Sequence, residues 1–347
     1  MTGTTANSRV QLLGYFGWGN FGDDLFLETC QDRASSLWPA SQVRAFEGDT
    51  SNFSRRSVRT RVRRLGTAVQ GAMWATSFAY CGGSVFSELA GTSALRTRLF
   101  SSHRFEALGI SVGPFAHVDD HRAVVRVLSM FDRVVVRDRE SYDRLSGACE
   151  LGGDLAALSR RFSPPWLSTD RPVGAGITIC PSSAAETKGP QLTEAIANAL
   201  GSTDVVITVL ALNSHPHLGD LRIAEDIATG LRDQGRAVRV LDYGSIGIGG
   251  VIEVLRSSRL VWSQRLHGAI ASYLSGVPTA IVDHHEKCGA FARDIGLDQR
   301  FLVRGFEELA PTLTAIDSDD SALAEPWTRS AADYRDRAAR IYSRAAY

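Results

Sequence analysis

The 347-residue chain is 44% hydrophobic and 22% charged, which is typical of a soluble globular protein large enough for two domains. Its 38 Lys and Arg residues balance its 38 Asp and Glu residues, so we expect no net field that would attract nucleic acid. Residues 1–9 lack the apolar core of a signal peptide, and no apolar run is long enough to span a membrane. The five cysteines include no C-x-x-C pair. We therefore predict a cytoplasmic protein with reduced thiols.

Apolar segments of strand length alternate with longer amphipathic segments, a pattern that indicates an α/β fold with mostly parallel strands. The strands that we predict in the first half are residues 10–15, 42–46, 77–81, 107–112 and 133–136. The strands that we predict in the second half are residues 174–180, 204–210, 237–241, 260–262 and 279–282. Helices are predicted at 218–232 and at 326–346, and the proline-containing stretch 162–171 predicts a linker.

These elements predict two Rossmann-like domains that face a cleft. The first domain covers residues 1–165 and the second covers residues 172–310. Residues 311–347 form a helical tail, which packs either back across the cleft or onto the first domain.

A glycine-rich loop, residues 17–22 (GWGNFG), follows the first predicted strand and opens a helix, as in a dinucleotide-binding site. Two features argue against a dinucleotide. Asp23 and Asp24 would repel a pyrophosphate at the helix N-terminus, and Trp18 and Phe21 add bulk where the backbone must approach a ligand closely.

Two interpretations of this loop stay open. The first is a capped turn, because carboxylates at a helix N-terminus complement the helix dipole. The second, which we favour, is a polar loop that binds neutral sugar hydroxyls, since a carboxylate accepts two hydrogen bonds from vicinal hydroxyl groups. Gly19, Asn20 and Asp23 are then the candidate acceptor-binding residues.

Arg265 and His267 stand where the predicted strand 260–262 ends and a helix of small residues begins near Gly268. Open α/β sheets build their sites at this edge. Arginine offers a planar fork to a carboxylate or phosphate, and histidine moves protons near neutral pH. The pair therefore predicts anion binding together with proton transfer. The alternative is a strand-end arginine that caps a carbonyl, beside a histidine satisfied in the core.

Several short motifs, in order over residues 13–296, resemble those of the polysaccharide pyruvyl transferases. They are Gly19-Asn20 with Gly22-Asp23, the segments 81–84 (CGGS), 109–114 (GISVGP), 136–141 (VRDRES) and 153–156 (GDLA), and Arg265-Leu266-His267 followed by Gly276-Val277-Pro278, Lys287 and Phe291. The chain departs from the family pattern where Cys180-Pro181 replaces an arginine, Ser84 a glycine, and Asp283-His284-His285 a tyrosine segment.

The resemblance implies a glycosyltransferase B-like architecture and the transfer of pyruvate from phosphoenolpyruvate to two hydroxyls of one sugar, giving a cyclic ketal. It implies an acceptor on a cell-surface glycan or its lipid-linked precursor, bound by the N-terminal domain. The C-terminal domain would bind the donor through Arg265, Leu266, Lys287 and His285, with His267 as the general acid. Phosphoenolpyruvate is a co-substrate in this scheme, which needs neither a cofactor nor a metal.

Two other functions remain open, a nucleotide-sugar-dependent glycosyltransferase and a non-catalytic glycan-binding relative. A basic run over residues 55–64 bears on whether the protein contacts a membrane. It contains Arg55, Arg56, Arg59, Arg61, Arg63 and Arg64. These side chains form either a solvated face or a peripheral contact with anionic lipid at the inner membrane surface.

Overall fold

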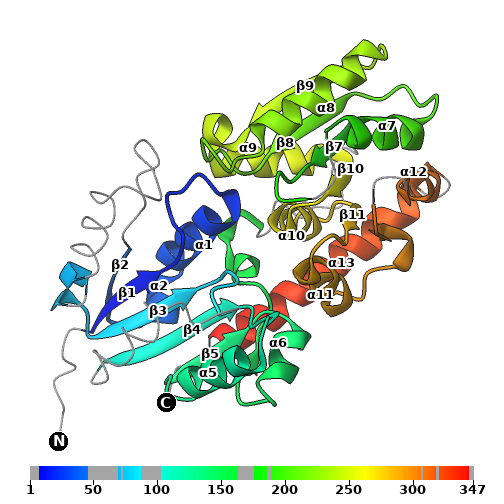
Figure 1. The fold of residues 1–347 in the computed structure, drawn as a ribbon. Coiled ribbons are helices and arrows are strands. Elements are labelled where there is room, and N and C mark those ends of the chain that lie inside the picture. The colour runs from blue at the N-terminus through cyan, green and yellow to red at the C-terminus, as the bar shows by residue number, and fades with distance from the viewer. Residues whose placement is uncertain are drawn as a thin grey trace, which may run out of the picture. The chain divides into compact units, whose positions relative to one another are not determined.

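The computed structural model describes residues 8–45, 69–71, 73–86, 103–162, 176–185, 189–305, 308–317 and 320–343 (Figure 1). The basic run 55–64 and nearly all of the predicted linker 162–171 lie outside these ranges. Contacts divide the chain into two compact units. Unit 1 comprises Met1–Trp18, Asp23–Ser159 and Arg337–Tyr347, and unit 2 comprises Gly19–Gly22 and Arg160–Asp336.

Unit 1 is built on a six-stranded parallel sheet with the strand order β2-β1-β3-β4-β5-β6. Its strands are β1 (Arg9–Leu13), β2 (Gln42–Ala45), β3 (Ser77–Cys81), β4 (Arg104–Ile110), β5 (Arg133–Val136) and β6 (Glu150–Leu151). Its helices include α1 (Phe21–Asp32), α2 (Ala34–Leu37), α5 (Val118–Leu128) and α6 (Arg139–Arg144). Every residue of β3 and β5 is buried, as expected of central parallel strands covered on both faces.

Unit 2 contains a second six-stranded parallel sheet, with the strand order β12-β11-β10-β7-β8-β9. Its strands are β7 (Gly176–Cys180), β8 (Ile207–Ala211), β9 (Val238–Asp242), β10 (Ser258–Ser263), β11 (Thr279–Val282) and β12 (Leu302–Val303). The helices are α7 (Gly189–Leu200), α8 (Leu221–Asp233), α9 (Tyr243–Arg256), α10 (Leu266–Leu274), α11 (Glu286–Asp294), α12 (Ala310–Asp317) and α13 (Asp320–Tyr342).

The two parallel sheets confirm the predicted α/β class with two Rossmann-like halves. The sequence patterns missed only short edge strands, β6 and β12, because two residues carry no periodicity. In each sheet the first strand along the chain lies inside the sheet, with later strands added first on one side of it and then on the other. This reversal of strand order lies between β1 and β3 in unit 1 and between β7 and β10 in unit 2. The carboxyl ends of strands at such switch points are where open α/β sheets bind ligands.

The end of α13 is fixed to unit 1 by side chains of that unit's sheet. The guanidinium of Arg133 donates to the carbonyl oxygens of Ile341 at 2.7 Å and Tyr342 at 3.5 Å, and to the carboxylate of Glu150 at 2.9 Å. The buried hydroxyl of Tyr342 donates to the carbonyl of Gly153 at 2.8 Å. Burial raises the pKa of Tyr342 well above its ordinary value, so this hydroxyl stays protonated and remains a donor.

Two buried tyrosines of unit 1 provide a matched test of this anchoring. Tyr342→Phe leaves the Gly153 carbonyl without its donor and should cost about 1 kcal/mol of unfolding free energy. Tyr80→Phe should be neutral or stabilising, because the buried Tyr80 hydroxyl has no hydrogen-bond partner in the part of the chain that is described. Urea unfolding of both variants checks this, and equal effects would contradict the anchoring role.

Candidate functional site

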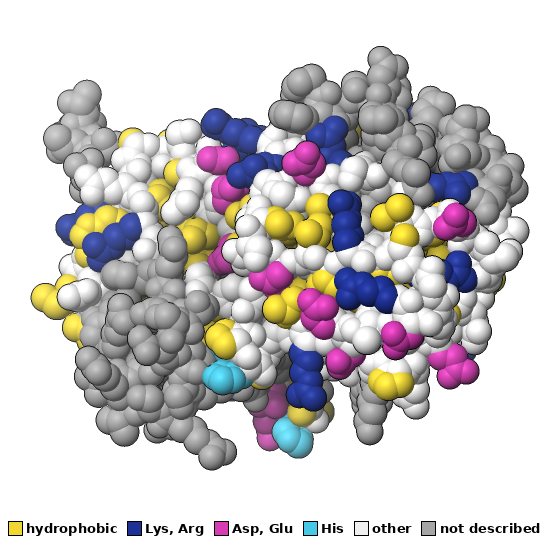
Figure 2. Space-filling view, turned by 90° about the horizontal axis from the view of Figure 1, so that it is seen from above, with side chains coloured by type: hydrophobic (Ala, Val, Ile, Leu, Met, Phe, Trp, Pro, Cys, Tyr) yellow, Lys and Arg dark blue, Asp and Glu magenta, His cyan; other side chains and the backbone are white. Residues whose placement is uncertain are grey.

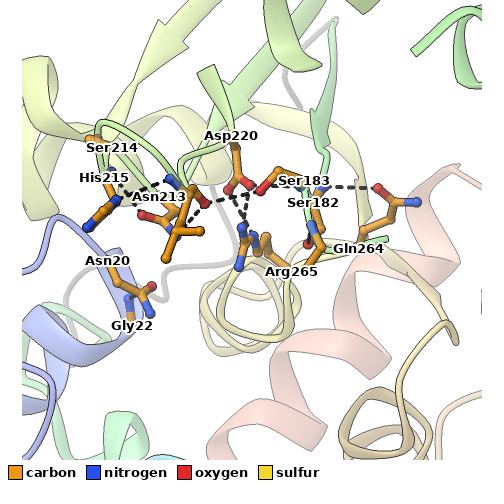
Figure 3. A network of polar contacts seen from close by, with 12 residues as sticks. Asn20, Gly22, Ser182, Ser183, Asn213, Ser214, His215, Asp220, Gln264 and Arg265 are labelled. Atoms are coloured by element: carbon orange, nitrogen blue, oxygen red, sulfur yellow. Dashed lines mark hydrogen bonds and ion pairs between the residues drawn. The ribbon is translucent and has the colours of Figure 1, made fainter. Parts of the chain in front are cut away.

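The carboxyl end of β10 leads directly into a buried ion pair. Arg265, the N-cap residue of α10, donates from Nε to Oδ2 of Asp220 at 2.8 Å and from Nη2 to Oδ1 of the same carboxylate (Figure 3). The Asp220 side chain is fully buried, whereas that of Arg265 is 21% exposed. Oδ1 of Asp220 also accepts from the backbone N–H of Ser183 at 3.0 Å. The two-point pair holds the plane of the guanidinium in one orientation.

The segment 213–220, between β8 and α8, is folded tightly enough to place Asp220 at the start of α8. The backbone N–H of Asp220 donates to the Asn213 carbonyl at 2.7 Å, and the Asn213 side chain accepts from the His215 N–H at 3.0 Å. A Cβ atom at Gly219 would overlap the backbone carbonyls of Asn213 and His215. Only glycine therefore fits this position, and the loop geometry follows from it.

His215 serves this loop as an acceptor. Its side chain is 6% exposed, and Nδ1 accepts from the backbone N–H groups of His217 and Leu218, both at 3.1 Å. Because both bonds need a lone pair on Nδ1, they favour the neutral imidazole with its proton on Nε2. The segment His215–His217 thus forms part of a turn.

His267 lies against the glycine-rich loop. It is the second residue of α10, and a Cβ atom at Gly22 would overlap its imidazole ring. The backbone N–H of Phe21 donates to the Leu212 carbonyl at 3.0 Å, and that of Ser214 donates to the Gly19 carbonyl at 2.7 Å. The last glycine of the G-x-G-x-x-G pattern therefore makes room for a histidine ring.

The segment after β7 completes this edge of the sheet. The backbone N–H of Gln264 donates to the Cys180 carbonyl at 2.9 Å, and the Gln264 side-chain oxygen accepts from the N–H of Ser182 at 2.9 Å (Figure 3). Burial raises the pKa of the Cys180 thiol, which therefore stays neutral. The position where the family pattern has an arginine thus contributes no charge.

The predicted donor-binding residues all lie at the N-termini of two helices of unit 2. Leu266 is the buried first residue of α10, His285 is the exposed N-cap residue of α11, and half-buried Lys287 is the second residue of α11. Burial lowers the pKa of His284, and the positive charges of Lys287 and Arg265 lower it further. The hydrogen bond of this imidazole with the Val282 carbonyl and the charge of Asp283 raise its pKa and oppose that shift.

Two of the candidate acceptor-binding residues, Gly19 and Asn20, belong to unit 2, whereas Asp23 belongs to unit 1. Asn20 forms an isolated antiparallel bridge with Asn213, and its side-chain oxygen accepts from the Gly22 N–H at 3.3 Å. Asp23 lies in the first turn of α1. The neighbouring Asp24 accepts from the Gly17 N–H at 2.7 Å, which ties the glycine-rich loop to the first turn of the helix, whereas the bond that caps α1 is the one from the Gly22 N–H to Asn20.

Arg137, at the end of β5, has a structural environment. Its side chain is 5% exposed and donates to the hydroxyl of Ser111 at 2.6 Å, to Asp154 at 3.4 Å and to the hydroxyl of Ser84 at 3.3 Å. Burial raises the pKa of Asp154, although the nearby charge of Arg137 opposes that shift. These bonds join the segments that follow four strands of unit 1, β3, β4, β5 and β6.

No group of three or more His, Cys, Asp and Glu side chains within the described ranges is arranged to hold a metal ion. None of the helices described is long and apolar enough to cross a membrane. On the face shown in Figure 2, acidic and basic side chains are interspersed, in keeping with the balanced composition.

Sequence patterns did not identify Asp220, Ser183, Gln264 or Ser182 as part of the site. Ser182, Ser183 and Gln264 follow strand ends closely, and Asp220 ends the loop after β8, but only a fold shows which strands are neighbours. Asp220 had one detectable signal, an acidic residue directly before a predicted helix in the connection that follows a buried strand. Its partner lies 45 positions further along the chain.

Comparison with known proteins gives one family and one fold. A model of the polysaccharide pyruvyl transferase family matches residues 20–286, and no curated protein matches the sequence. A putative UDP-N-acetylglucosamine 2-epimerase from Listeria monocytogenes is similar in structure, with a TM-score of 0.59 at 12% identity over 97% of this chain and 95% of that one. HepE from Anabaena, in complex with UDP and glucose, has a TM-score of 0.56 at 13% identity over 95% of each chain.

A glycosyltransferase from Rickettsia africae is also similar, with a TM-score of 0.54 at 13% identity over 98% of each chain. Likenesses at such low identity concern the fold alone. They confirm that the two parallel sheets are those of the glycosyltransferase B class.

Removal of the Asp220 carboxylate should destabilise unit 2. Asp220→Ala leaves a mostly buried guanidinium without its partner and should cost about 2 to 3 kcal/mol, somewhat less than a fully buried pair because Arg265 remains 21% exposed. Asp143→Ala breaks the exposed Arg139–Asp143 pair, whose side chains are 63% and 60% exposed, and should cost no more than about 0.5 kcal/mol. Chemical denaturation of the two variants measures the difference, and similar losses would show that the Asp220 pair is not a stabilising contact.

Gly22→Ala should displace the His267 ring. Alanine suits a helical position intrinsically, but its Cβ would overlap that ring. If His267 is the proton-transfer group that the sequence predicts, turnover should fall at least about tenfold, since misplacement of a catalytic group by about 1 Å can cost more than that. Melting temperature and turnover should be measured together. Unchanged turnover would show that the histidine position is unimportant.

Proposed function

The chain belongs to the polysaccharide pyruvyl transferase family, and on this premise we propose that it transfers pyruvate from phosphoenolpyruvate to two hydroxyls of one sugar. The product is a cyclic ketal and the leaving group is inorganic phosphate. The acceptor that we propose is a sugar of a cell-surface glycan or of its lipid-linked precursor. The observation that carries this proposal is the oriented Arg265 guanidinium beside His267 at the β7/β10 switch point.

Arg265 suits a donor with both a carboxylate and a phosphate. Asp220 engages Nε and one N–H of Nη2, so the opposite edge of the guanidinium keeps paired N–H groups in the fork geometry that these anions match. Asp220 also fixes the fork before the ligand arrives, which lowers the entropy cost of binding. A buried carboxylate beside the arginine does not attract the donor. Its role is to aim the donor-binding group.

Further positive potential comes from the two helices. Leu266 and His267 open α10, so their backbone N–H groups lie in its first turn, where intrahelical partners are lacking. Lys287 adds a point charge in the first turn of α11, and His285 stands at the N-cap of the same helix. We propose that these groups bind the donor together with Arg265, in place of the arginine that Cys180-Pro181 lacks.

In the mechanism that we propose, His267 is the general acid. It protonates the terminal methylene carbon of the enol, which makes the adjacent carbon electrophilic. One sugar hydroxyl adds to that carbon and loses its proton, phosphate departs with the electrons of its C–O bond, and the second hydroxyl closes the ring. His267, deprotonated in the first step, then accepts the proton of the first hydroxyl, and the departing phosphate takes the proton of the second.

The same geometry supports a place for the acceptor. The segment Gly19–Gly22 lies against the His267 ring in unit 2, so hydroxyls bound by Gly19 and Asn20 would lie beside the group that moves the protons. Asp23 follows directly in the chain and is proposed as an acceptor for sugar hydroxyl groups. We further propose that the enzyme works in the cytoplasm, with a peripheral contact at the inner membrane face when the acceptor is lipid-linked.

The donor assignment can be tested by ligand-induced stabilisation. Millimolar phosphoenolpyruvate should raise the melting temperature of the wild type, because a ligand that binds only the folded state stabilises it by mass action. Arg265→Lys keeps the charge but loses the fork, so this shift should largely disappear. His267→Gln should keep the shift and lose ketal formation, followed by mass spectrometry of the sugar product.

UDP-glucose serves as the comparison ligand in the same experiment. Stabilisation by UDP-glucose with none by phosphoenolpyruvate would contradict the proposal and favour a nucleotide-sugar donor. Stabilisation by phosphoenolpyruvate that persists fully in Arg265→Lys would place the donor elsewhere.

A further inference from the structure

The loop that follows β1 in unit 1 carries an exposed aromatic side chain. Tyr15 is 58% exposed and is the only aromatic residue among the large exposed hydrophobic side chains of the described ranges. Its ring meets that of Trp18 edge to face, with centroids 6.4 Å apart and an interplanar angle of 88°. Trp18 is itself half-buried, so it supports Tyr15 from the side of the protein.

The exposure of Tyr15 is imposed by its neighbours. Phe16 is 1% exposed, and its ring folds back so closely that a Cβ atom at Gly14 would overlap it. On the other side, the Gly17 N–H donates to the Asp24 carboxylate at 2.7 Å and ties the loop to the first turn of α1. Tyr15 therefore stands on a loop that is fixed at both ends, and its ring is held in solvent at a cost in hydrophobic free energy.

The position of this loop indicates a ligand. It leaves the carboxyl end of β1 at the β1/β3 switch point of unit 1, where open α/β sheets bind small molecules. Across the switch point, β3 continues into the turn at Gly83, and the Asp23 carboxylate lies 3.9 Å from where a Cβ atom at Gly83 would be. The Tyr15 ring and the carboxylates of Asp23 and Asp24 thus stand on segments that follow the same sheet edge, where Asp24 already accepts from the Gly17 N–H.

These groups select the chemical class of the ligand. Carboxylates repel phosphate, nucleotide and acidic sugar groups, but accept hydrogen bonds from neutral hydroxyls. An aromatic face with negative potential attracts the slightly positive C–H bonds on the apolar face of a pyranose ring. We propose that Tyr15, supported by Trp18, is the stacking platform for an uncharged pyranose ring of the acceptor. That the bound sugar is the acceptor rests on the proposed function, whereas the platform itself rests on the geometry of unit 1.

The platform should be tested first by binding without donor. Saturation-transfer NMR with the full chain and a set of methyl hexopyranosides reports contact between sugar protons and the protein. We expect binding to wild type and to Tyr15→Phe, and at least about tenfold weaker binding to Tyr15→Ala, because the ring face and not the hydroxyl makes the contact. Met130→Ala removes a side chain of unit 1 that is 55% exposed and serves as the matched control, with unchanged binding expected.

The charge of the sugar provides a second test of the platform. Methyl glucuronide should bind more weakly than methyl glucoside, since its carboxylate would approach Asp23 and Asp24. Each of four outcomes would overturn the platform. They are unaltered sugar binding in Tyr15→Ala, equal losses of binding in Tyr15→Phe and Tyr15→Ala, a preference for the glucuronide, and no pyranoside binding by the wild type.

Steady-state kinetics separate this inference from the proposed function. If pyruvyl transfer occurs, Tyr15→Ala should raise the KM for the sugar at least about tenfold and leave the KM for phosphoenolpyruvate unchanged; a change in the donor KM alone would contradict the platform. If no pyruvyl transfer occurs but Tyr15→Ala still abolishes sugar binding, the proposed function fails and the platform stands.

Discussion

The buried pair between Asp220 and Arg265 is the constraint on which the candidate site depends. A carboxylate with no solvent exposure is costly unless it is paired and hydrogen-bonded, and Asp220 satisfies that requirement with the guanidinium and the Ser183 N–H. The consequence is geometric. An arginine on a flexible stem becomes a fixed fork at the N-cap position of α10, and His267 is the second residue of that helix.

The loop 213–220 extends that constraint to the rest of unit 2. At one end Asp220 holds Arg265, and at the other Asn213 and Ser214 pair with the backbone of the segment Gly19–Gly22. Gly22 in turn lies against the His267 ring. A single loop after β8 therefore positions Arg265 directly and His267 through an intermediate segment. Both Gly219 and Gly22 must lack a side chain. A Cβ at Gly219 would overlap carbonyl groups of the loop, and a Cβ at Gly22 would overlap the His267 ring.

Both units follow one topological rule with different chemistry. In unit 2 the switch point between β7 and β10 gathers Arg265, its partner Asp220, His267 and the neutral Cys180 thiol. In unit 1 the switch point between β1 and β3 gathers Tyr15, Trp18 and the first-turn carboxylates of α1. The groups that we propose for the donor thus lie at one sheet edge, and those of the proposed sugar platform lie at the other.

The sequence by itself determined the α/β class, the central strands and the family. Hydrophobic runs such as 77–81 and 279–282 coincide with β3 and β11, because buried parallel strands need apolar side chains on both faces. It also located Arg265 and His267, because their spacing is local. Only the tertiary structure decided that Asp220 orients Arg265, that Gly22 makes room for His267, and that the last residues of α13 pack with unit 1. These contacts join residues far apart in the chain, and local patterns carry no information about which strand ends become neighbours.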